Sequence, residues 1–250
     1  MNTIDTNLYL KDFKACDNCI NGFIKSINSF GEEETEICDC LERYNSNFAL
    51  KINLQLSGIK TSIFDYNIDT YKGQDKEKNI LKIKKIITNF ETKFYNKNFY
   101  FYSKLNSCQK TTLALYIGKE LLIKKKQCYF VLMDSLIKLL IDENRSEEEA
   151  MSLINKYYKA DFLIIDDCFD LKKVTVYKSG YQLAYLDSFL RKRLESLEKC
   201  TLFTSNTLLD NIADQGFGES IQNLIKRNCY EMTFCDRVTG QPSYENLFDD

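Results

Sequence analysis

The order of apolar and polar positions predicts strands and helices that alternate from residue 77 onwards. Over residues 77–95, apolar side chains recur at alternating spacings of three and four, which predicts one buried face of a helix. Short apolar runs then alternate with further helical patterns. The predicted strands cover residues 98–102, 128–133, 162–166, 200–204 and 229–234, and the predicted helices between them cover 111–124, 134–142, 146–158, 181–197 and 217–227. Five strands separated by helices predict an α/β fold with a parallel sheet covered on both faces.

The first 76 residues do not follow this pattern. Residues 41–75 are mixed and polar, with a turn predicted at Ser57-Gly58-Ile59. We therefore predict a small head over residues 1–45, a linker over 46–76 and the main domain over 77–250. No apolar run approaches the roughly 20 residues of a membrane span, and no N-terminal segment has the order of a signal peptide. We expect a cytoplasmic protein with no membrane partner.

The composition excludes several classes of chemistry. The chain has 34 basic and 36 acidic side chains, so its net charge of −2 excludes a histone-like polycation but not a local basic patch. It contains no histidine. A histidine base, a Ser-His-Asp triad, a Cys-His pair and a histidine-ligated metal are therefore excluded.

The ten cysteines form two groups. Four of them make the pairs Cys16-x2-Cys19 and Cys38-x-Cys40. Two close pairs joined by a hairpin-length spacer can bind zinc tetrahedrally, and metal binding would then supply the folding energy of so small a segment. The alternative is four ordinary cysteines of a reducing compartment. The other six lie in or beside apolar runs and are predicted to be small core residues: Cys108, Cys128, Cys168, Cys200, Cys229 and Cys235.

A loop with part of the pattern of a phosphate-binding loop follows the first predicted strand. Residues 103–109 lead from that strand to Lys110, Thr111 and Thr112, which open a helix. In a phosphate loop the lysine reaches the outer phosphates, the hydroxyl binds Mg²⁺, and backbone N–H groups at the helix N-terminus cradle the phosphates. The two glycines of the pattern are absent, with Lys104 and Gln109 in their positions.

Two further strand ends carry polar residues, at the edge where open parallel sheets bind ligands. Asp166 and Asp167 follow the apolar residues 162–165, as Walker B acids do, where the first acid holds Mg²⁺ and the second polarises the attacking water. Asn206 ends the run Thr204-Ser205-Asn206 and can orient water against a terminal phosphate. The strand at 128–133 is inserted between the phosphate-loop strand and the acidic strand, which is the topology of additional-strand ATPases.

With these motifs in this order, the sequence resembles the helicase loaders of the DnaC/DnaI type, AAA+ proteins that are grouped with the IstB transposition ATPases. The resemblance extends over nearly the whole chain. Its parts are the opening Cys16-x2-Cys19 with Cys38-Asp39-Cys40-Leu41, the stretch Ser57-Gly58-Ile59, Phe64-Asp65 and Ile68, the motifs Lys110-Thr111, Asp166-Asp167 and Thr204-Ser205-Asn206, and Gly218-Glu219-x-Ile221 at the start of the finger motif.

The resemblance implies an AAA+ domain that binds ATP and Mg²⁺, and a zinc head that contacts a hexameric replicative helicase and delivers it onto single-stranded DNA. Gln109, Lys110, Thr111, Thr112 and Asp166 would bind the nucleotide and its Mg²⁺, Asp167 and Asn206 would act in hydrolysis, and the four head cysteines would bind zinc. We expect oligomers on the helicase ring. The runs 124–126 and 191–193 are candidate DNA contacts, with solvated helix faces as the alternative.

Two departures from the family pattern bear on hydrolysis. Lys104, Ser107 and Gln109 replace glycines of the phosphate loop. Ser220 and Leu224 stand where the family has finger arginines. Lys226 and Arg227 follow Leu224 and could substitute, and Arg227 is the candidate finger. Two alternatives to a hydrolysing loader are therefore open: a degenerate AAA+ scaffold for the helicase that does not hydrolyse ATP, and a transposition ATPase of the IstB type.

Overall fold

The computed structural model describes residues 12–73, 75–141, 147–170, 173–174, 180–197 and 199–234. The chain divides into two compact units, Met1–Leu56 and Ser57–Asp250, and each is described by itself. The division lies inside the predicted linker, so the domain bounds 1–45, 46–76 and 77–250 stay a prediction. Among the helices of the described residues, none combines the length and apolar composition that a bilayer crossing needs.

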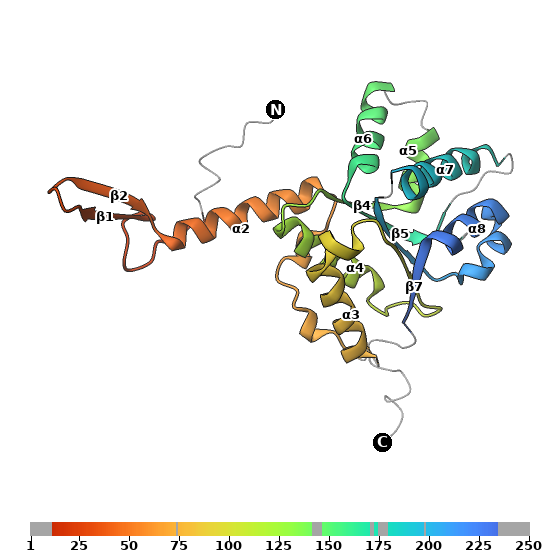
Figure 1. Cartoon of the computed structure of the whole chain (residues 1–250), viewed down its shortest axis with the longest axis horizontal. Helices are drawn as coiled ribbons and strands as arrows, with labels where there is room; N and C mark the ends of the chain where they lie inside the picture. Colours follow the sequence, from red (N-terminus) through yellow and green to blue (C-terminus); the bar gives the residue numbers. More distant parts are fainter. Residues whose placement is uncertain are drawn as a thin grey trace, which may run out of the picture. The chain divides into compact units, whose positions relative to one another are not determined.

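The first unit consists of a hairpin and a helix (Figure 1). Strands β1 (Phe23–Ile27) and β2 (Glu33–Ile37) pair antiparallel, and every residue of both strands is exposed. Gly22 has a φ of +89°, and a Cβ atom there would lie 2.8 Å from the Leu41 side chain, so only glycine fits at this position. A two-stranded hairpin without a buried face is marginally stable in water. This hairpin therefore needs a further source of stability.

Helix α2 (Asp39–Leu56) follows the hairpin and was not predicted. From the sequence, residues 41–75 are mixed and polar and no helix is predicted there. The structure corrects this over the length of α2. The reason lies in the second half of the helix, where apolar residues occur at every second position: Phe48, Leu50, Ile52, Leu54 and Leu56. This period of two is typical of a strand, so the sequence pattern does not predict a helix here.

The second unit is built on a parallel sheet, as predicted. Within the described residues its strands are β3 (Asn98–Tyr102), β4 (Cys128–Leu132), β5 (Phe162–Cys168), β6 (Cys200–Ser205) and β7 (Cys229–Thr233). Their order across the sheet is β4-β5-β6-β3-β7, and each neighbouring pair is parallel. The inserted strand β4 therefore lies at one edge, next to the acidic strand β5, and β7 forms the other edge.

Helices connect these strands close to the predicted bounds. They are α3 (Lys76–Thr88), α4 (Lys110–Ile123), α5 (Met133–Ile141), α6 (Glu147–Lys159), α7 (Tyr181–Arg191) and α8 (Gly218–Asn228). Single wider turns of the π type extend α3 at Phe90–Phe94 and α7 at Lys192–Ser196, and another precedes α8 at Ala213–Phe217. Short 3₁₀ turns cover Thr61–Ile63, Ile68–Thr70 and Leu209–Asn211. The predicted helix 181–197 thus keeps its length, but its last leucine, Leu197, is 40% exposed.

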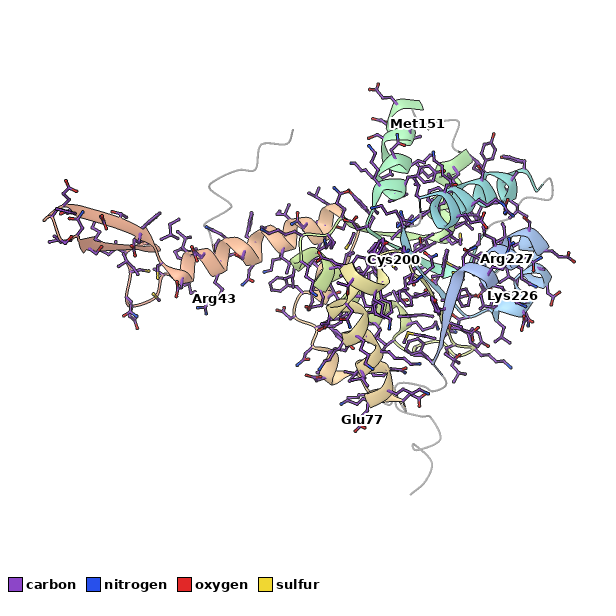
Figure 2. All side chains as sticks on the ribbon, viewed as in Figure 1. Arg43, Glu77, Met151, Cys200, Lys226 and Arg227 are labelled. Carbon is purple, nitrogen blue, oxygen red and sulfur yellow. The ribbon has the colours of Figure 1, made fainter. Side chains whose placement is uncertain are left out.

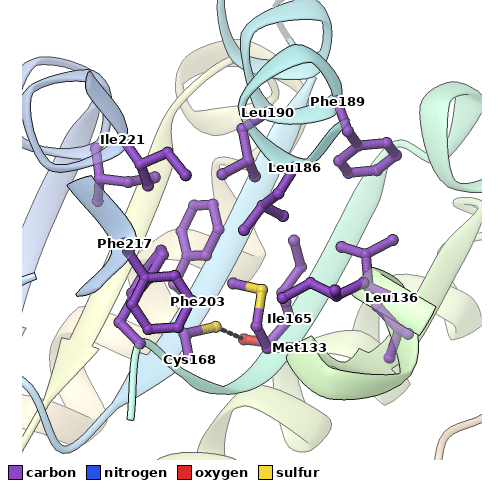
Figure 3. Close-up of a cluster of buried hydrophobic side chains, with 14 of the residues drawn as sticks. Met133, Leu136, Ile165, Cys168, Leu186, Phe189, Leu190, Phe203, Phe217 and Ile221 are labelled. Atoms are coloured by element: carbon purple, nitrogen blue, oxygen red, sulfur yellow. Dashed lines mark hydrogen bonds between the residues drawn. The ribbon is translucent and has the colours of Figure 1, made fainter. Parts of the chain in front are cut away.

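Apolar residues from α5, α7 and α8 cover one face of the sheet (Figure 3). Alternate strand residues such as Ile165 and Phe203 point into this cluster, where they meet Leu186, Leu190 and Ile221. On the opposite face, Ile164 approaches helix α4 at Gly118, where a Cβ atom would lie 3.1 Å from it. Both faces of the central strands are therefore buried, which explains why their sequences are continuous apolar runs.

The core cysteines follow the prediction where the structure describes them. Cys108, Cys128, Cys168 and Cys200 are at most 1% exposed, whereas Cys229 is partly buried. Cys235 lies outside the described residues.

Arg193 is a fully buried cation in this core and corrects the prediction that residues 191–193 form an exposed basic run. Its guanidinium has no carboxylate partner among the described residues and is satisfied instead by oxygen atoms of neighbouring segments. Burial lowers its pKa to about 10. The five hydrogen bonds, 2.6 to 3.1 Å long, go to Thr201 Oγ1 and to the carbonyl oxygens of Tyr157, Tyr158, Ala160 and Cys200. Arg193 therefore joins the end of α6 to strand β6 and is excluded as a DNA contact.

Candidate nucleotide site and cysteine cluster

The loop between β3 and α4 has left-handed backbone where the family pattern has glycines. Ser107 has a φ of +63° and Gln109 a φ of +58°, whereas Lys104 does not have a positive φ. Such a conformation costs a non-glycine residue about 1–2 kcal/mol. Strained backbone of this kind persists where the surrounding structure enforces it, and it gathers at functional sites.

A buried thiol holds this loop in shape. Cys108 is 1% exposed, and its sulfur lies 3.1 Å from Ser103 Oγ and donates to the Leu105 carbonyl oxygen at 3.3 Å. The Ser103 hydroxyl in turn accepts the backbone N–H of Leu105 at 3.1 Å. The loop thus folds around Cys108 and leads directly into α4.

Thr111 and Asp166 meet at the carboxyl edge of the sheet. The Thr111 hydroxyl donates to Asp166 Oδ1 at 2.7 Å, and the Thr204 hydroxyl on β6 donates to the same oxygen. Asp166 is 5% exposed, and burial raises the pKa of its carboxyl group, although the two hydroxyl groups act in the opposite direction. A carboxylate and a threonine hydroxyl are oxygen ligands of the kind that Mg²⁺ takes in nucleotide sites.

Lys110 lies in the same cluster. Its side chain is largely buried, and its ammonium group donates to the Leu105 carbonyl oxygen at 3.3 Å. Burial lowers the pKa of Lys110, while the charges of Asp167 and Asp166 are close enough to raise it. The loop lysine and both acids therefore share one electrostatic site.

Asp167 and Asn206 have partners that the sequence did not predict. Asp167 has a φ of +54° and lies in a bulge between β5 and β6, and its Oδ1 forms an ion pair with Lys173 at 2.6 Å. Asn206 donates from Nδ2 to Asn106 Oδ1 in the loop at 3.0 Å. Thus the third strand end reaches the loop, as the proximity of strand ends predicts.

Sequence reasoning missed the roles of Thr204 and Lys173 at this site. The sequence assigns no role to Thr204 itself, yet its hydroxyl donates to Asp166 and accepts the Asp167 backbone N–H at 3.2 Å. The signal that could have found it is the strand order, which places β6 next to β5 and is set by packing of the whole sheet. Nothing in the sequence marks Lys173, which follows Asp167 by six residues. The buried Gln109 Oε1 has no hydrogen-bond partner among the described residues, and Thr112 is half-buried on the first turn of α4.

The finger motif lies on helix α8, which begins at Gly218. Polar contacts are found near its start, and buried apolar residues follow. The Ser220 hydroxyl accepts from Arg191 Nη2 at 2.8 Å, and Leu224 is fully buried. Lys226 forms an ion pair with Asp210. Arg227 is exposed near the end of α8 (Figure 2). Its Nη2 lies 3.8 Å from the Glu195 carboxylate.

The other predicted DNA contacts are mostly engaged within the domain. Lys124 donates to the Ile87 carbonyl oxygen at 2.7 Å, and Lys126 forms an ion pair with Glu91. Arg191 binds the carboxylate of Asp187 at 2.8 Å. These contacts leave few free cations in either run.

The four head cysteines come together as predicted. The Cys16 sulfur lies 3.6 Å from the sulfurs of Cys19 and Cys38, and the Cys19 sulfur lies 3.4 Å from that of Cys40. All four sulfur atoms lie within 4.8 Å of one another, and none is in a disulfide. A tetrahedron with Zn–S bonds of about 2.3 Å has edges of about 3.8 Å. The cluster therefore has the ligand set and the size of a structural zinc site.

Comparison with solved structures shows the same fold in replication proteins. DnaI matches with a TM-score of 0.56 and 17% identity, over 72% of this chain and 93% of its own. The DnaC helicase loader matches with a TM-score of 0.55 and 21% identity, over 70% and 99%. The replication initiator DnaA, in a structure bound to AMPPCP and single-stranded DNA, matches with a TM-score of 0.53 and 15% identity, over 67% of this chain and 49% of its own.

No protein-family model matches the sequence, and the search of curated proteins finds no match. The comparisons therefore define the fold: a parallel, five-stranded sheet flanked by helices, as in DnaI and the DnaC helicase loader, with a small head whose cysteine cluster is consistent with zinc. The predicted resemblance to DnaC- and DnaI-type proteins is confirmed at this level.

Proposed function

We propose that this protein is a replicative helicase loader that binds ATP with Mg²⁺ and delivers a hexameric helicase onto single-stranded DNA during replication initiation. The observation that carries the proposal is the 2.7 Å contact between Thr111 and Asp166, beside a loop with left-handed backbone at Ser107 and Gln109. The fold shared with DnaI and the DnaC helicase loader supports the same role.

The nucleotide would occupy the carboxyl edge of the sheet. Backbone N–H groups of Gln109 to Thr112 lie at the N-terminus of α4, where the helix dipole favours phosphate, and Lys110 supplies a positive charge. Thr111 and Asp166 would hold Mg²⁺, which neutralises charge on the phosphates when bound. Bound Mg²⁺ would also offset the cost of burying the ionised Asp166 carboxylate.

Hydrolysis is the second part of the proposal. Asp167 would polarise the attacking water, with Asn206 orienting it, once Asp167 is released from its ion pair with Lys173. A cation at the transferred phosphate would come from Arg227, which is exposed near the end of α8. AAA+ neighbours complete each other's sites in this way, so this part also proposes oligomers on the helicase ring.

The head would dock on the helicase. Its hairpin and the turns around it expose large apolar side chains: Ile20, Ile27, Phe30 and Ile37 are 52% to 87% exposed. Exposed apolar patches of this kind mark protein–protein contact sites. Zinc bound by the four cysteines would fix the hairpin that presents them.

A degenerate scaffold that holds the helicase without hydrolysing ATP is the second candidate. It is favoured by the side chains at Ser107 and Gln109 and by the Lys173 pair that occupies Asp167. An IstB-type transposition ATPase has no such specific support from the site.

Phosphate release separates the two candidates. Co-purification of the cognate helicase with the full chain is tested first. Phosphate release is then measured with that helicase and single-stranded DNA, for the wild type and for Asp167→Asn. The loader predicts turnover that Asp167→Asn abolishes, whereas co-purification without turnover supports the scaffold. Failure to co-purify with the helicase contradicts both.

A further inference from the structure

A groove lies at the β7 edge of the second unit, beside the amino end of β3, whereas Lys110 follows the carboxyl end of that strand. It has a volume of about 340 Å³ and is lined by α3, the wide turn Phe90–Phe94, β3 and β7. Its lining is mostly apolar and includes Ile86, Phe99 and Met232. We call it the α3–β7 groove.

Four lysines surround the α3–β7 groove. Lys82 and Lys85 come from α3, and Lys93 and Lys97 come from the segment between α3 and β3. None of the four lies within 4 Å of a carboxylate among the described residues. By contrast, Lys84 on the same helix pairs with Asp69 at 3.1 Å. The cations around the groove are thus not neutralised by the fold.

One carboxylate interrupts this positive rim. Glu231 belongs to the lining, and its Oε1 accepts the Thr233 hydroxyl at 3.0 Å. Four lysines and one glutamate leave the groove with a net formal charge of +3. In a chain with an overall charge of −2, this is a local attraction for polyanions.

Aromatic rings form a row through the same groove. The Phe94 and Phe99 ring centroids are 5.9 Å apart, and those of Phe99 and Tyr230 are 6.5 Å apart. Tyr230 is 59% exposed on the edge strand, and Lys93 lies 5.7 Å from the Phe94 ring centroid. An exposed tyrosine backed by a buried ring offers a flat face on which a base can stack.

We propose that the α3–β7 groove binds single-stranded DNA, with phosphates at the four lysines and a base stacked on Tyr230. Lysines that track the backbone and aromatic rings that take bases are the combination that binds single strands without sequence preference. The apolar lining accommodates an unpaired base, whereas a duplex presents no base face. This inference rests on the proposed function, in which the loader binds single-stranded DNA. It deepens that function by naming the surface that binds the DNA.

The test is fluorescence anisotropy of a labelled dT20 oligonucleotide with the full chain, titrated at several salt concentrations. Contact with about four phosphates predicts that log K falls against log salt with a slope of roughly −2.8. Lys82→Gln with Lys85→Gln should reduce that slope by about 1.4. Lys84→Gln, on the same helix but ion-paired, is the matched control and should leave the slope unchanged.

Stacking is tested separately from charge. Tyr230→Ala should weaken binding about 5- to 150-fold at every salt concentration, whereas Tyr230→Phe should retain the wild-type affinity. Tyr230 is exposed, so melting temperatures close to that of the wild type are expected and show that the variants are folded.

The outcomes distinguish this proposal from the proposed function. Lys110→Ala should lose nucleotide and keep dT20. If Lys110→Ala loses dT20 while the groove variants keep it, DNA binds at the nucleotide site and the groove proposal is overturned. The groove proposal is also overturned if dT20 does not bind to the full chain. It is overturned as well if polyglutamate displaces dT20 and Tyr230→Ala does not change the affinity, because the groove would then be a surface for acidic protein. Helicase co-purification and ATP binding remain independent measurements of the loader.

Discussion

The two units of this chain are stabilised in different ways. The hairpin β1–β2 has every residue exposed, and its organisation comes from four sulfur atoms within 4.8 Å of one another. The parallel sheet of the second unit is buried on both faces, and even Arg193 has its hydrogen bonds satisfied within the fold. The difference leads us to expect that the head needs a bound metal ion for its fold. The sheet depends on apolar burial and can hold strained or charged groups at its carboxyl edge.

Zinc removal should have the largest effect and should be confined to the head. Structural zinc contributes roughly 10–16 kcal/mol to the folding of small domains, so Cys38→Ser or a strong chelator should abolish protection of residues 23–37 in hydrogen exchange. The melting temperature of the sheet should stay unchanged. Metal analysis should find one equivalent of zinc in the wild type and in the control Cys229→Ser. Retained protection in metal-free protein would contradict the distinction between the units.

Loss of Arg193 should have the largest effect on the sheet. Arg193→Met removes five hydrogen bonds and leaves four carbonyl oxygens, three of them in buried hydrogen bonds, without this partner, which should cost about 3–5 kcal/mol in the free energy of unfolding. Denaturant unfolding measures this, with the exposed Lys192→Met as its control. Zinc content should not change. A loss equal to that of the control would show that Arg193 does not join α6 to β6.

Asp166→Asn should have opposite effects on the stability of the sheet and on ATP binding. Burial makes the ionised carboxylate unfavourable, so its removal should stabilise the nucleotide-free protein by about 1–2 kcal/mol. The same change removes a Mg²⁺ ligand and should weaken Mg²⁺-dependent ATP binding at least tenfold. Thermal melting with and without Mg²⁺·ATP checks both parts. A variant that is less stable without nucleotide would mean that Asp166 has a structural role.

Relief of backbone strain should have the smallest effect. Ser107→Gly removes a side chain from a residue with a φ of +63° and should stabilise the protein by about 0.5–1 kcal/mol, because glycine's greater freedom when unfolded offsets part of the gain. ATP affinity should rise as well, since the backbone can approach phosphate more closely. Lys104→Gly, at a position without positive φ, is the control and should bring no gain. Equal effects of the two changes would show that the loop conformation carries no strain.

The sequence predicted the sheet well because its strands are buried on both faces and read as continuous apolar runs. It did not predict α2, whose apolar residues follow a period of two. It placed Arg193 in an exposed run, because a run of charges in sequence does not show that one member points into the core. Lys173 and the α3–β7 groove could not be predicted either, since the groove joins residues 82–97 to residues 230–232 only once the edge strand is in place.

The site was predicted in its residues rather than in its contacts. Lys110, Thr111 and Asp166 were named from their places at strand ends, and the structure brings them into one cluster with Asp167. Their roles with nucleotide and Mg²⁺ stay predictions. The hydrogen bond from Thr204 to Asp166 depends on β6 lying next to β5. That strand order is set by packing of the whole sheet, which the sequence alone does not show.

The most direct test of the central claim is the affinity of the full chain for a fluorescent ATP analogue with Mg²⁺. The account predicts saturable binding that Lys110→Ala abolishes, that EDTA weakens, and that Lys104→Ala in the same loop leaves intact. Affinity that is unchanged in Lys110→Ala would contradict the claim that this loop holds the phosphates.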